Sequence, residues 1–99
     1  SGAQNWYYLY AADAADALLA LAKRGRAGEI YNIANGGYRP LRDYIEEARA
    51  VIAPQCDVTY GAADADVVSL QPSVEKIRRD TGWMATTDFE GGMQKILLI

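Results

Sequence analysis

Hydrophobic positions recur at helical spacing in four separate stretches of the chain. The first stretch, Ala14–Ala22, follows Asp13, which we expect to cap a helix by accepting hydrogen bonds from the free amides of its first turn. Gly25 stands where a left-handed residue commonly ends a helix, so we expect the helix to stop there. The expected apolar face consists of Ala14, Ala17, Leu18, Leu21 and Ala22.

The second helix is expected from about Pro40 to Ala53, with Pro40 at the first helical position and Pro54 ending it. Arg42 and Glu46 lie four residues apart on its polar side, where an ion pair would add a little stability. The expected apolar face consists of Leu41, Tyr44, Ile45, Ala48, Val51 and Ile52.

Two shorter helices are expected near the end of the chain. Ser73 can cap the first of them and Gly82 can end it, with Trp83 packing back on Ile77. The last helix is expected to begin near Thr87, which has capping-box spacing to a glutamate three residues later. The apolar residues expected on one face of this helix are Phe89, Met93, Ile96 and Leu97.

Short extended segments are expected between the helices. Aromatic and aliphatic residues predict strands over Tyr7–Tyr10, Glu29–Ile33 and Cys56–Tyr60, and a further extended segment over Val67–Leu70. Gly61–Asp66 is expected to be a small acidic loop. The pattern therefore predicts an α/β fold in which about four helices pack on a short mixed sheet.

Composition places residues 1–99 in one small domain with a thin core, since 51% of residues are hydrophobic and 23% are charged. A net charge of −3 argues against a nucleic-acid or anionic-membrane partner. The lone Cys56 excludes an internal disulfide and is compatible with the cytoplasm, while the lack of histidine excludes a Ser-His-Asp triad and a histidine-ligated metal site. The chain begins Ser1-Gly2 and ends on apolar residues, so we expect it to be a piece of a longer protein.

Three local features could carry chemistry, but each has a simpler interpretation. The loop Asn35–Gly37 could cradle a phosphate, although no phosphate-binding glycine motif surrounds it and a plain turn is favoured. Glu46 and Glu47 point about 100° apart on a helix, so a solvated face is favoured over a catalytic pair. Arg78 and Arg79 lie near a helix C-terminus, where arginine is expected without any ligand.

Three motifs in a fixed order resemble the C-terminal, substrate-binding part of NAD(P)-dependent epimerase/dehydratases, the extended short-chain dehydrogenase/reductases that typically act on nucleotide sugars. A strand that leads into an alanine-rich helix is matched by Tyr8, Leu9, Tyr10 and Asp13. A Gly-x-aliphatic-Tyr-Asn-Ile-Gly motif is matched by Gly28, Ile30, Tyr31, Asn32, Ile33 and Ala34. The late motifs are matched by Lys76, Ile77, Arg78, Gly82 and Trp83, then by Phe89, Gly91 or Gly92, and Met93.

The departures from this family pattern concern the ligand. The arginine that holds the substrate's diphosphate in the family falls on Trp6, and a second phosphate-binding arginine falls on Ala63, although the aspartate of that loop is kept as Asp66. Both bidentate guanidinium contacts to phosphate are therefore missing. The resemblance implies a sugar or nucleotide-sugar substrate, and these departures leave open a smaller or uncharged one.

The resemblance also implies that the catalytic half lies outside this sequence. The family needs a glycine-rich turn for the cofactor pyrophosphate and a Tyr-x-x-x-Lys pair for proton transfer, and no tyrosine here has a lysine four residues later. We therefore expect no catalytic, cofactor-binding or metal-binding residue in the chain, which should be inactive alone. NAD or NADP would be bound by the missing Rossmann domain of the parent chain. By position, the substrate-facing side chains would be Trp6 and Tyr8, unless both are simply packed aromatics.

Two other hypotheses stay open at this point. The chain could be a stand-alone small α/β binding or oligomerisation module without a catalytic parent, or an unrelated small α/β domain. If it is an excised lobe, the strand Tyr7–Tyr10 and the helix Ala14–Ala22 would leave an apolar surface, and we expect the fragment to self-associate. We also expect no measurable binding of NAD(H) or NADP(H).

Overall fold

The computed structural model describes residues 1–61 and 71–98. Four helices and two short strands follow one another in the order β1 (Asn5–Trp6), α1 (Ala11–Arg24), β2 (Arg39–Pro40), α2 (Leu41–Ile52), α3 (Glu75–Thr81) and α4 (Phe89–Leu97). The two strands are antiparallel, with Asn5 opposite Pro40 and Trp6 opposite Arg39. The chain is therefore a small α/β fold with four helices, as the sequence predicted.

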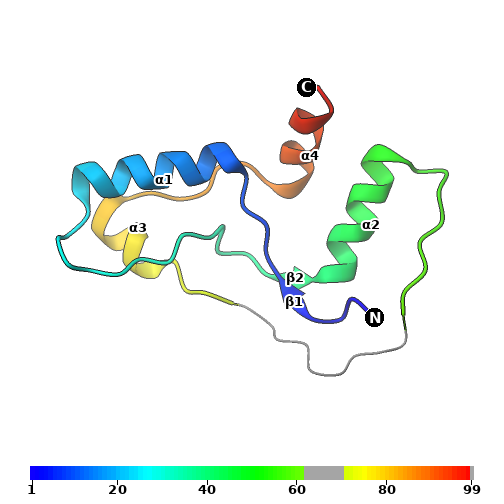
Figure 1. The fold of residues 1–99 in the computed structure, drawn as a ribbon, viewed down its shortest axis with the longest axis horizontal. Helices are drawn as coiled ribbons and strands as arrows, with labels where there is room; N and C mark the ends of the chain where they lie inside the picture. Colours follow the sequence, from blue (N-terminus) through cyan, green and yellow to red (C-terminus); the bar gives the residue numbers. More distant parts are fainter. Residues whose placement is uncertain (62–70, 99) are drawn as a thin grey trace.

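The molecule is flat. Its Cα atoms span 47 × 36 × 15 Å, and the radius of gyration of 15.9 Å exceeds the roughly 13 Å of a compact chain of this length. The chain forms two halves side by side: α1 packs on α3 in one, and α2 packs on α4 and β2 in the other (Figure 1). We call these the α1/α3 half and the α2/α4 half.

The α1/α3 half encloses the apolar core. Ala17 and Ile77 are fully buried, and Ala20 and Trp83 pack with them. The expected contact between Trp83 and Ile77 is thus confirmed. Leu18 was expected on the buried face but is 61% exposed, because Ala17, Ala20 and the half-buried Leu21 form the face of α1 that packs in the core. Small side chains allow the two helices to approach closely here.

Asp13 does not cap α1, contrary to expectation. The helix begins two residues earlier at Ala11, and its N-cap residue Tyr10 makes no side-chain capping bond. The Asp13 carboxylate is buried and accepts hydrogen bonds from the Thr86 amide at 3.3 Å, the Thr86 hydroxyl at 3.0 Å and the Thr87 amide at 2.9 Å. It therefore ties the start of α1 to the segment that enters α4.

Only one of the two glycines expected to end a helix in the left-handed conformation does so. Gly82 ends α3 with φ of +76°, as expected of a left-handed cap. Gly25 after α1 is extended, with φ of −69°, so the left-handed cap expected there is wrong. A Cβ atom at Gly25 would nevertheless lie 2.6 Å from the Leu21 carbonyl oxygen, which explains the glycine by close approach.

The other helix starts differ from expectation by one or two residues. Pro40 is the N-cap of α2 and lies just before its first turn. The Ser73 hydroxyl accepts from the Glu75 amide at 3.3 Å, although α3 has Val74 as its N-cap residue. Thr87 does not cap α4: the Asp88 carboxylate accepts from the Gly91 amide at 2.7 Å, while the Thr87 amide is bound to Asp13.

Three expected strands are not strands. Tyr7–Tyr10, Glu29–Ile33 and Cys56–Tyr60 are irregular, and within the described residues the sheet has two antiparallel strands rather than a mixed order. The aromatic residues in the last two segments instead direct their hydroxyls to carboxylates on helices, Tyr31 to Asp80 and Tyr60 to Glu46. The expected segment Val67–Leu70 and nearly all of Gly61–Asp66 lie outside the described residues.

The expected ion pair between Arg42 and Glu46 is also wrong. Glu46 pairs with Arg49 at 2.9 Å, while the Arg42 guanidinium donates to the Ser1 carbonyl and lies 5.2 Å from the centre of the Tyr60 ring. The Tyr60 hydroxyl donates to the other oxygen of Glu46, so the carboxylate is already satisfied without Arg42.

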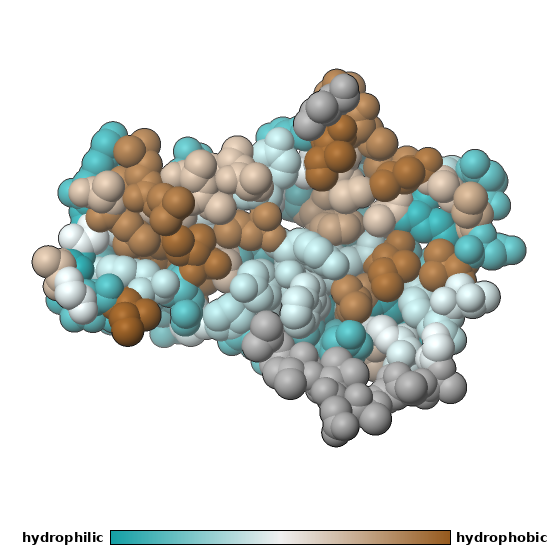
Figure 2. Space-filling view, viewed as in Figure 1, coloured by the Kyte–Doolittle hydropathy of each residue, from teal (hydrophilic) through white to brown (hydrophobic). Residues whose placement is uncertain are grey.

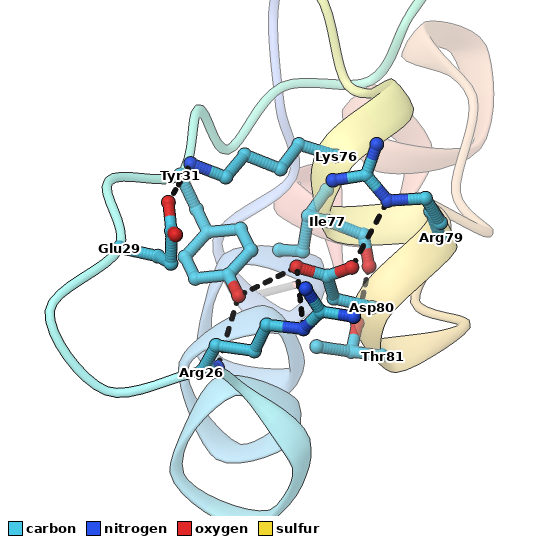
Figure 3. A network of polar contacts seen from close by, with 8 residues as sticks. All are labelled: Arg26, Glu29, Tyr31, Lys76, Ile77, Arg79, Asp80 and Thr81. Atoms are coloured by element: carbon cyan, nitrogen blue, oxygen red, sulfur yellow. Dashed lines mark hydrogen bonds and ion pairs between the residues drawn. The ribbon is translucent and has the colours of Figure 1, made fainter.

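A polar network fixes the loop after α1 to α3 (Figure 3). The Tyr31 hydroxyl donates to the Asp80 carboxylate at 2.8 Å and accepts from the Arg26 amide at 2.9 Å. Arg79 donates to the same carboxylate at 3.1 Å, and Lys76 pairs with Glu29 at 2.5 Å on the outer side. The hydrogen bond from Tyr31, followed by that from Arg79, lowers the pKa of Asp80.

Large apolar side chains remain on the surface. Figure 2 shows them gathered over α1 and at the free end of α4. Leu18 and Leu19 on α1, and Ile96, Leu97 and Leu98 at the end of α4, are each more than half exposed. The flat shape thus leaves apolar surface uncovered in both halves.

Candidate functional site

Three aromatic rings form a wall in the α2/α4 half. Tyr8 from the segment after β1 lies 5.1 Å from Tyr44 of α2 and 5.5 Å from Phe89 of α4, measured between ring centroids. The ring centroids of Tyr44 and Phe89 lie 5.0 Å apart, with their planes at 65° to each other. Edge-to-face rings of this kind form a stiff apolar surface. Each side of this aromatic wall borders a hollow.

The first hollow is polar and has a volume of about 520 Å³. It lies between the β2–α2 corner and the segment that enters α4. Its lining residues are Asn35, Gly37, Tyr38, Arg39, Tyr44, Glu47, Ala85, Thr86, Thr87, Asp88 and Phe89. The second hollow, of about 400 Å³, is mainly apolar and is lined by Tyr8, Leu9, Tyr10, Thr87, Asp88, Phe89, Gly92, Met93 and Ile96.

An arginine and a glutamate form the charged part of the polar hollow. A guanidinium nitrogen of Arg39 lies 2.6 Å from the Glu47 carboxylate, and the guanidinium carbon lies 4.2 Å from the centre of the Tyr44 ring. Partial burial lowers the pKa of Arg39 more than any single interaction raises it, but the hydrogen bonds and charge attraction of Glu47 and Tyr44 together outweigh burial, so that the pKa is raised overall. The two side chains form an ion pair whose formal charges cancel.

Asp13 holds two of the residues that line the polar hollow. Its buried carboxylate holds the amides of Thr86 and Thr87, and both threonines line the polar hollow. Hydrogen bonds to an ionised acceptor are roughly twice as strong as those between neutral groups. The position of the lining residues Thr86 and Thr87 therefore depends on a residue that does not itself line the hollow.

The two substrate-facing residues predicted from the sequence lie in different places. Tyr8 belongs to the aromatic wall, is 47% exposed and lines the apolar hollow. Trp6 lies in β1, lines neither of the two hollows, and its carbonyl accepts from the Tyr44 hydroxyl at 3.2 Å. A substrate-binding role for either residue stays a prediction.

Arg39 and Glu47 were missed from the sequence. Glu47 was weighed only together with Glu46, whose carboxylate turns instead to Arg49 and Tyr60. The two glutamates therefore do not converge on one point, as their helical spacing predicted. Arg39 gave one usable signal, its place directly before Pro40 at the start of a helix, but nothing in the sequence showed that it would lie opposite Trp6.

The other candidates for chemistry have local explanations. The Asn35 side chain accepts from the Gly37 amide at 2.7 Å and donates to the Tyr8 carbonyl at 2.5 Å, so the Asn35–Gly37 loop is an internally bonded turn. Across residues 1–61 and 71–98 no group of three or more His, Cys, Asp or Glu side chains could hold a metal ion. In the same residues no helix is long and apolar enough to cross a membrane. Ala63 and Asp66 lie outside the described residues.

Solved structures share this fold over part of their length. RMD from Pseudomonas aeruginosa, complexed with NADPH, matches 99% of this chain with a TM-score of 0.86 and 21% identity. The enzyme WbmF from Bordetella bronchiseptica, in complex with NADH, matches 95% with a TM-score of 0.79 and 25% identity. A dTDP-glucose 4,6-dehydratase from Bacillus anthracis, in complex with NAD, matches 99% with a TM-score of 0.77 and 20% identity.

The chain spans about a third of the length of these proteins, with 33%, 28% and 31% of each covered. No family model matches the chain. No curated protein matches it either. The chain therefore has the fold of one part of enzymes that bind nicotinamide cofactors, and the family resemblance of its sequence is supported at the level of fold.

Proposed function

We propose that this chain is the substrate-binding lobe of an NAD(P)-dependent sugar or nucleotide-sugar epimerase/dehydratase-like oxidoreductase. The observation that carries the proposal is the match of 99% of the chain to one third of RMD, at a TM-score of 0.86. The three sequence motifs support it independently, because they occur in the family's order. A dTDP-glucose dehydratase and a WbmF complex that contains both NAD⁺ and UDP are further structures with this fold.

In this proposal the reaction is completed by a Rossmann domain on the same parent chain. None of the seven tyrosines has a lysine four residues later, so this chain holds no candidate for the family's proton-transfer pair. The lobe alone is inactive and contributes the substrate side of the cleft, with Tyr8 and Trp6 as its candidate contacts. The parent enzyme would act in the cytoplasm, where the exposed thiol of Cys56 stays reduced.

The coding sequence upstream of Ser1 provides the direct test. We expect it to encode, within roughly 200 residues, a glycine-rich turn after a strand and a Tyr-x-x-x-Lys motif. Purified enzyme from that longer reading frame should bind NAD(H) or NADP(H) in a calorimetric titration, while the 99-residue chain should not. Micromolar cofactor affinity in the 99-residue chain alone, or an upstream sequence without both motifs, would refute the proposal.

The proposal also includes self-association of the separate lobe. Leu18 and Leu19 on α1 would be covered by the rest of the parent chain, and without it they are more than half exposed. Sedimentation velocity should show concentration-dependent dimers or larger species, which Leu19→Glu should reduce. A monomer at high concentration would instead show that the exposed leucines of α1 do not cause association, and would contradict this part of the proposal. Self-association in a chain without a catalytic parent would favour the alternative of an oligomerisation module.

A further inference from the structure

The polar hollow has an unusual charge balance for a site in a nucleotide-sugar enzyme. Among its described lining residues Arg39 is the sole cation, while Glu47 and Asp88 are carboxylates. Arg39 already pairs with Glu47 at 2.6 Å, and the Asp88 carboxylate caps α4 through the Gly91 amide. A phosphate entering here would have to compete with Glu47 for the guanidinium and would lie close to a second carboxylate. The hollow therefore disfavours a phosphate group.

The same residues suit a ligand that both donates and accepts hydrogen bonds. A guanidinium has five N–H donors, so Arg39 retains donors beyond the nitrogen bound to Glu47. The side chain of Glu47 is 27% exposed and that of Arg39 is 40% exposed, so both are accessible from the hollow. A hydroxyl group donates to a carboxylate and accepts from a guanidinium. Two neighbouring hydroxyls would therefore fit this pair.

The aromatic wall supplies the apolar side of such a site. Tyr44 and Phe89 line the hollow beside the ion pair, and the Arg39 guanidinium is held over the Tyr44 ring. The volume of about 520 Å³ lies within the range of small-molecule sites, which combine apolar walls with a few placed polar groups. We propose that the polar hollow binds a neutral, polyhydroxylated sugar ring through Arg39 and Glu47.

This inference rests on the proposed function for the class of ligand. It adds where the ligand binds and that the bound ring is neutral. It also agrees with the position of Trp6, which stands where the family has a phosphate-binding arginine and lies opposite Arg39 in the two-stranded sheet. Arg39 does not replace that arginine as a phosphate contact, because its charge is neutralised by Glu47.

Saturation-transfer NMR on the 99-residue chain tests the proposal with D-glucose, D-mannose and D-galactose, each compared with its 1-phosphate. At least one free hexose should bind saturably, and its 1-phosphate should bind several-fold more weakly. Glu47→Gln should weaken hexose binding about tenfold, because a hydrogen bond to a charged acceptor is lost. Arg39→Lys keeps the charge but loses the planar fork, and it should also weaken binding several-fold.

Glu46→Gln is the matched control, because Glu46 is adjacent on α2 but pairs with Arg49 and Tyr60 outside the hollow. Its hexose affinity should equal that of the unchanged chain, with folding of each variant checked by circular dichroism. If Glu47→Gln does not fold, Arg39→Lys carries the same comparison. Absence of saturable hexose binding, tighter binding of the 1-phosphates, or equal losses in Glu46→Gln and Glu47→Gln would overturn the proposal.

The hexose-binding test and the test of the proposed function can fail independently of each other. A parent with both cofactor motifs but a lobe that binds no hexose would refute the sugar site and leave the oxidoreductase proposal standing. Hexose binding that depends on Glu47, together with an upstream sequence lacking the cofactor motifs, would support the site and refute the oxidoreductase.

Discussion

The two halves of the molecule differ in the side chains that pack between their helices. In the α1/α3 half, alanines of α1 face Ile77 and Trp83, and the polar network around Asp80 fixes the adjoining loop. In the α2/α4 half, the ring of Tyr44 meets those of Tyr8 and Phe89 edge to face, and the three rings border the polar and the apolar hollow. Small residues let helices close on each other, whereas rigid rings leave concave space between them. The first half therefore holds the buried cluster around Ile77, and the second half offers space for a ligand.

The strongest test of this contrast is Ile77→Ala. Ile77 is fully buried, and truncation of such a side chain costs about 2–5 kcal/mol through lost burial and a residual cavity. Urea denaturation followed by circular dichroism should show a large fall in the unfolding midpoint. Ile52→Ala removes the same atoms from α2 at a site that is 51% exposed and should have a much smaller effect. Similar losses in both variants would contradict a core confined to the α1/α3 half.

Asp13→Ala should have the next largest effect, because Asp13 joins the two halves. The substitution removes one carboxylate from three hydrogen bonds and leaves the amides of Thr86 and Thr87 without their acceptor. We expect a loss of about 2–3 kcal/mol in the free energy of unfolding. Asp16→Ala, one turn later on the exposed side of α1, is the control and should be nearly neutral. A near-neutral Asp13→Ala would show that the connection is dispensable.

The aromatic wall should be less sensitive than the core. Phe89→Leu removes the ring contacts with Tyr8 and Tyr44 while keeping an apolar side chain, so we expect a loss of about 1 kcal/mol. Near-ultraviolet circular dichroism should report the altered tyrosine packing at the same time. Met93→Leu, one turn later on α4, should leave that spectrum unchanged. A loss as large as that of Ile77→Ala would place a second core in the α2/α4 half.

The smallest expected effects concern acid stability, and they compare one tyrosine from each half. The Tyr31 hydroxyl lowers the pKa of Asp80, and the Tyr60 hydroxyl lowers the pKa of Glu46. A carboxyl whose pKa is lowered by folding stabilises the protein above its unfolded pKa of about 4, and this stability is lost as the pH falls through the folded value.

Tyr31→Phe and Tyr60→Phe should therefore each reduce the loss of stability between pH 5 and pH 2.5, when urea midpoints are compared with the unchanged chain. The effect should be larger for Tyr31→Phe, since the side chain of Asp80 is 2% exposed and that of Glu46 is 44% exposed. The reverse order would show that the hydrogen bond from Tyr31 to Asp80 contributes less to acid stability than the one from Tyr60 to Glu46.

The sequence predicted the helices better than the strands. Helical periodicity found all four helices, because an amphipathic pattern is a local property, and Gly82 correctly marked the end of α3. The segments around Tyr31 and Tyr60 looked like strands because aromatic composition is shared by strands and by loops that bond to helices through tyrosine hydroxyls. Which of the two occurs depends on partners distant in the chain.

The candidate site was less predictable than the fold. Tyr8 was singled out and does line a hollow, but Arg39 and Glu47 come together only because α2 follows β2 directly and turns Glu47 back toward the strand. Aspartate is a residue type that commonly caps helices, so the sequence predicted a cap at Asp13. Its bonds to the amides of Thr86 and Thr87 could be found only in the folded structure. Contacts of this kind depend on tertiary structure and leave no local pattern.

The bond between Asp13 and Thr87 spans 74 positions of the chain, which has a consequence for folding during synthesis. Helix α1 leaves the ribosome long before its partners Ile77 and Trp83, and at roughly 5–20 residues per second the wait is about 3–13 s. During this time its alanine and leucine faces have no native partner, and contacts so distant in sequence also form slowly in the free chain. Helix α1, which later packs in the core, is thus exposed to aggregation and to chaperones until α3 and Trp83 have been synthesised.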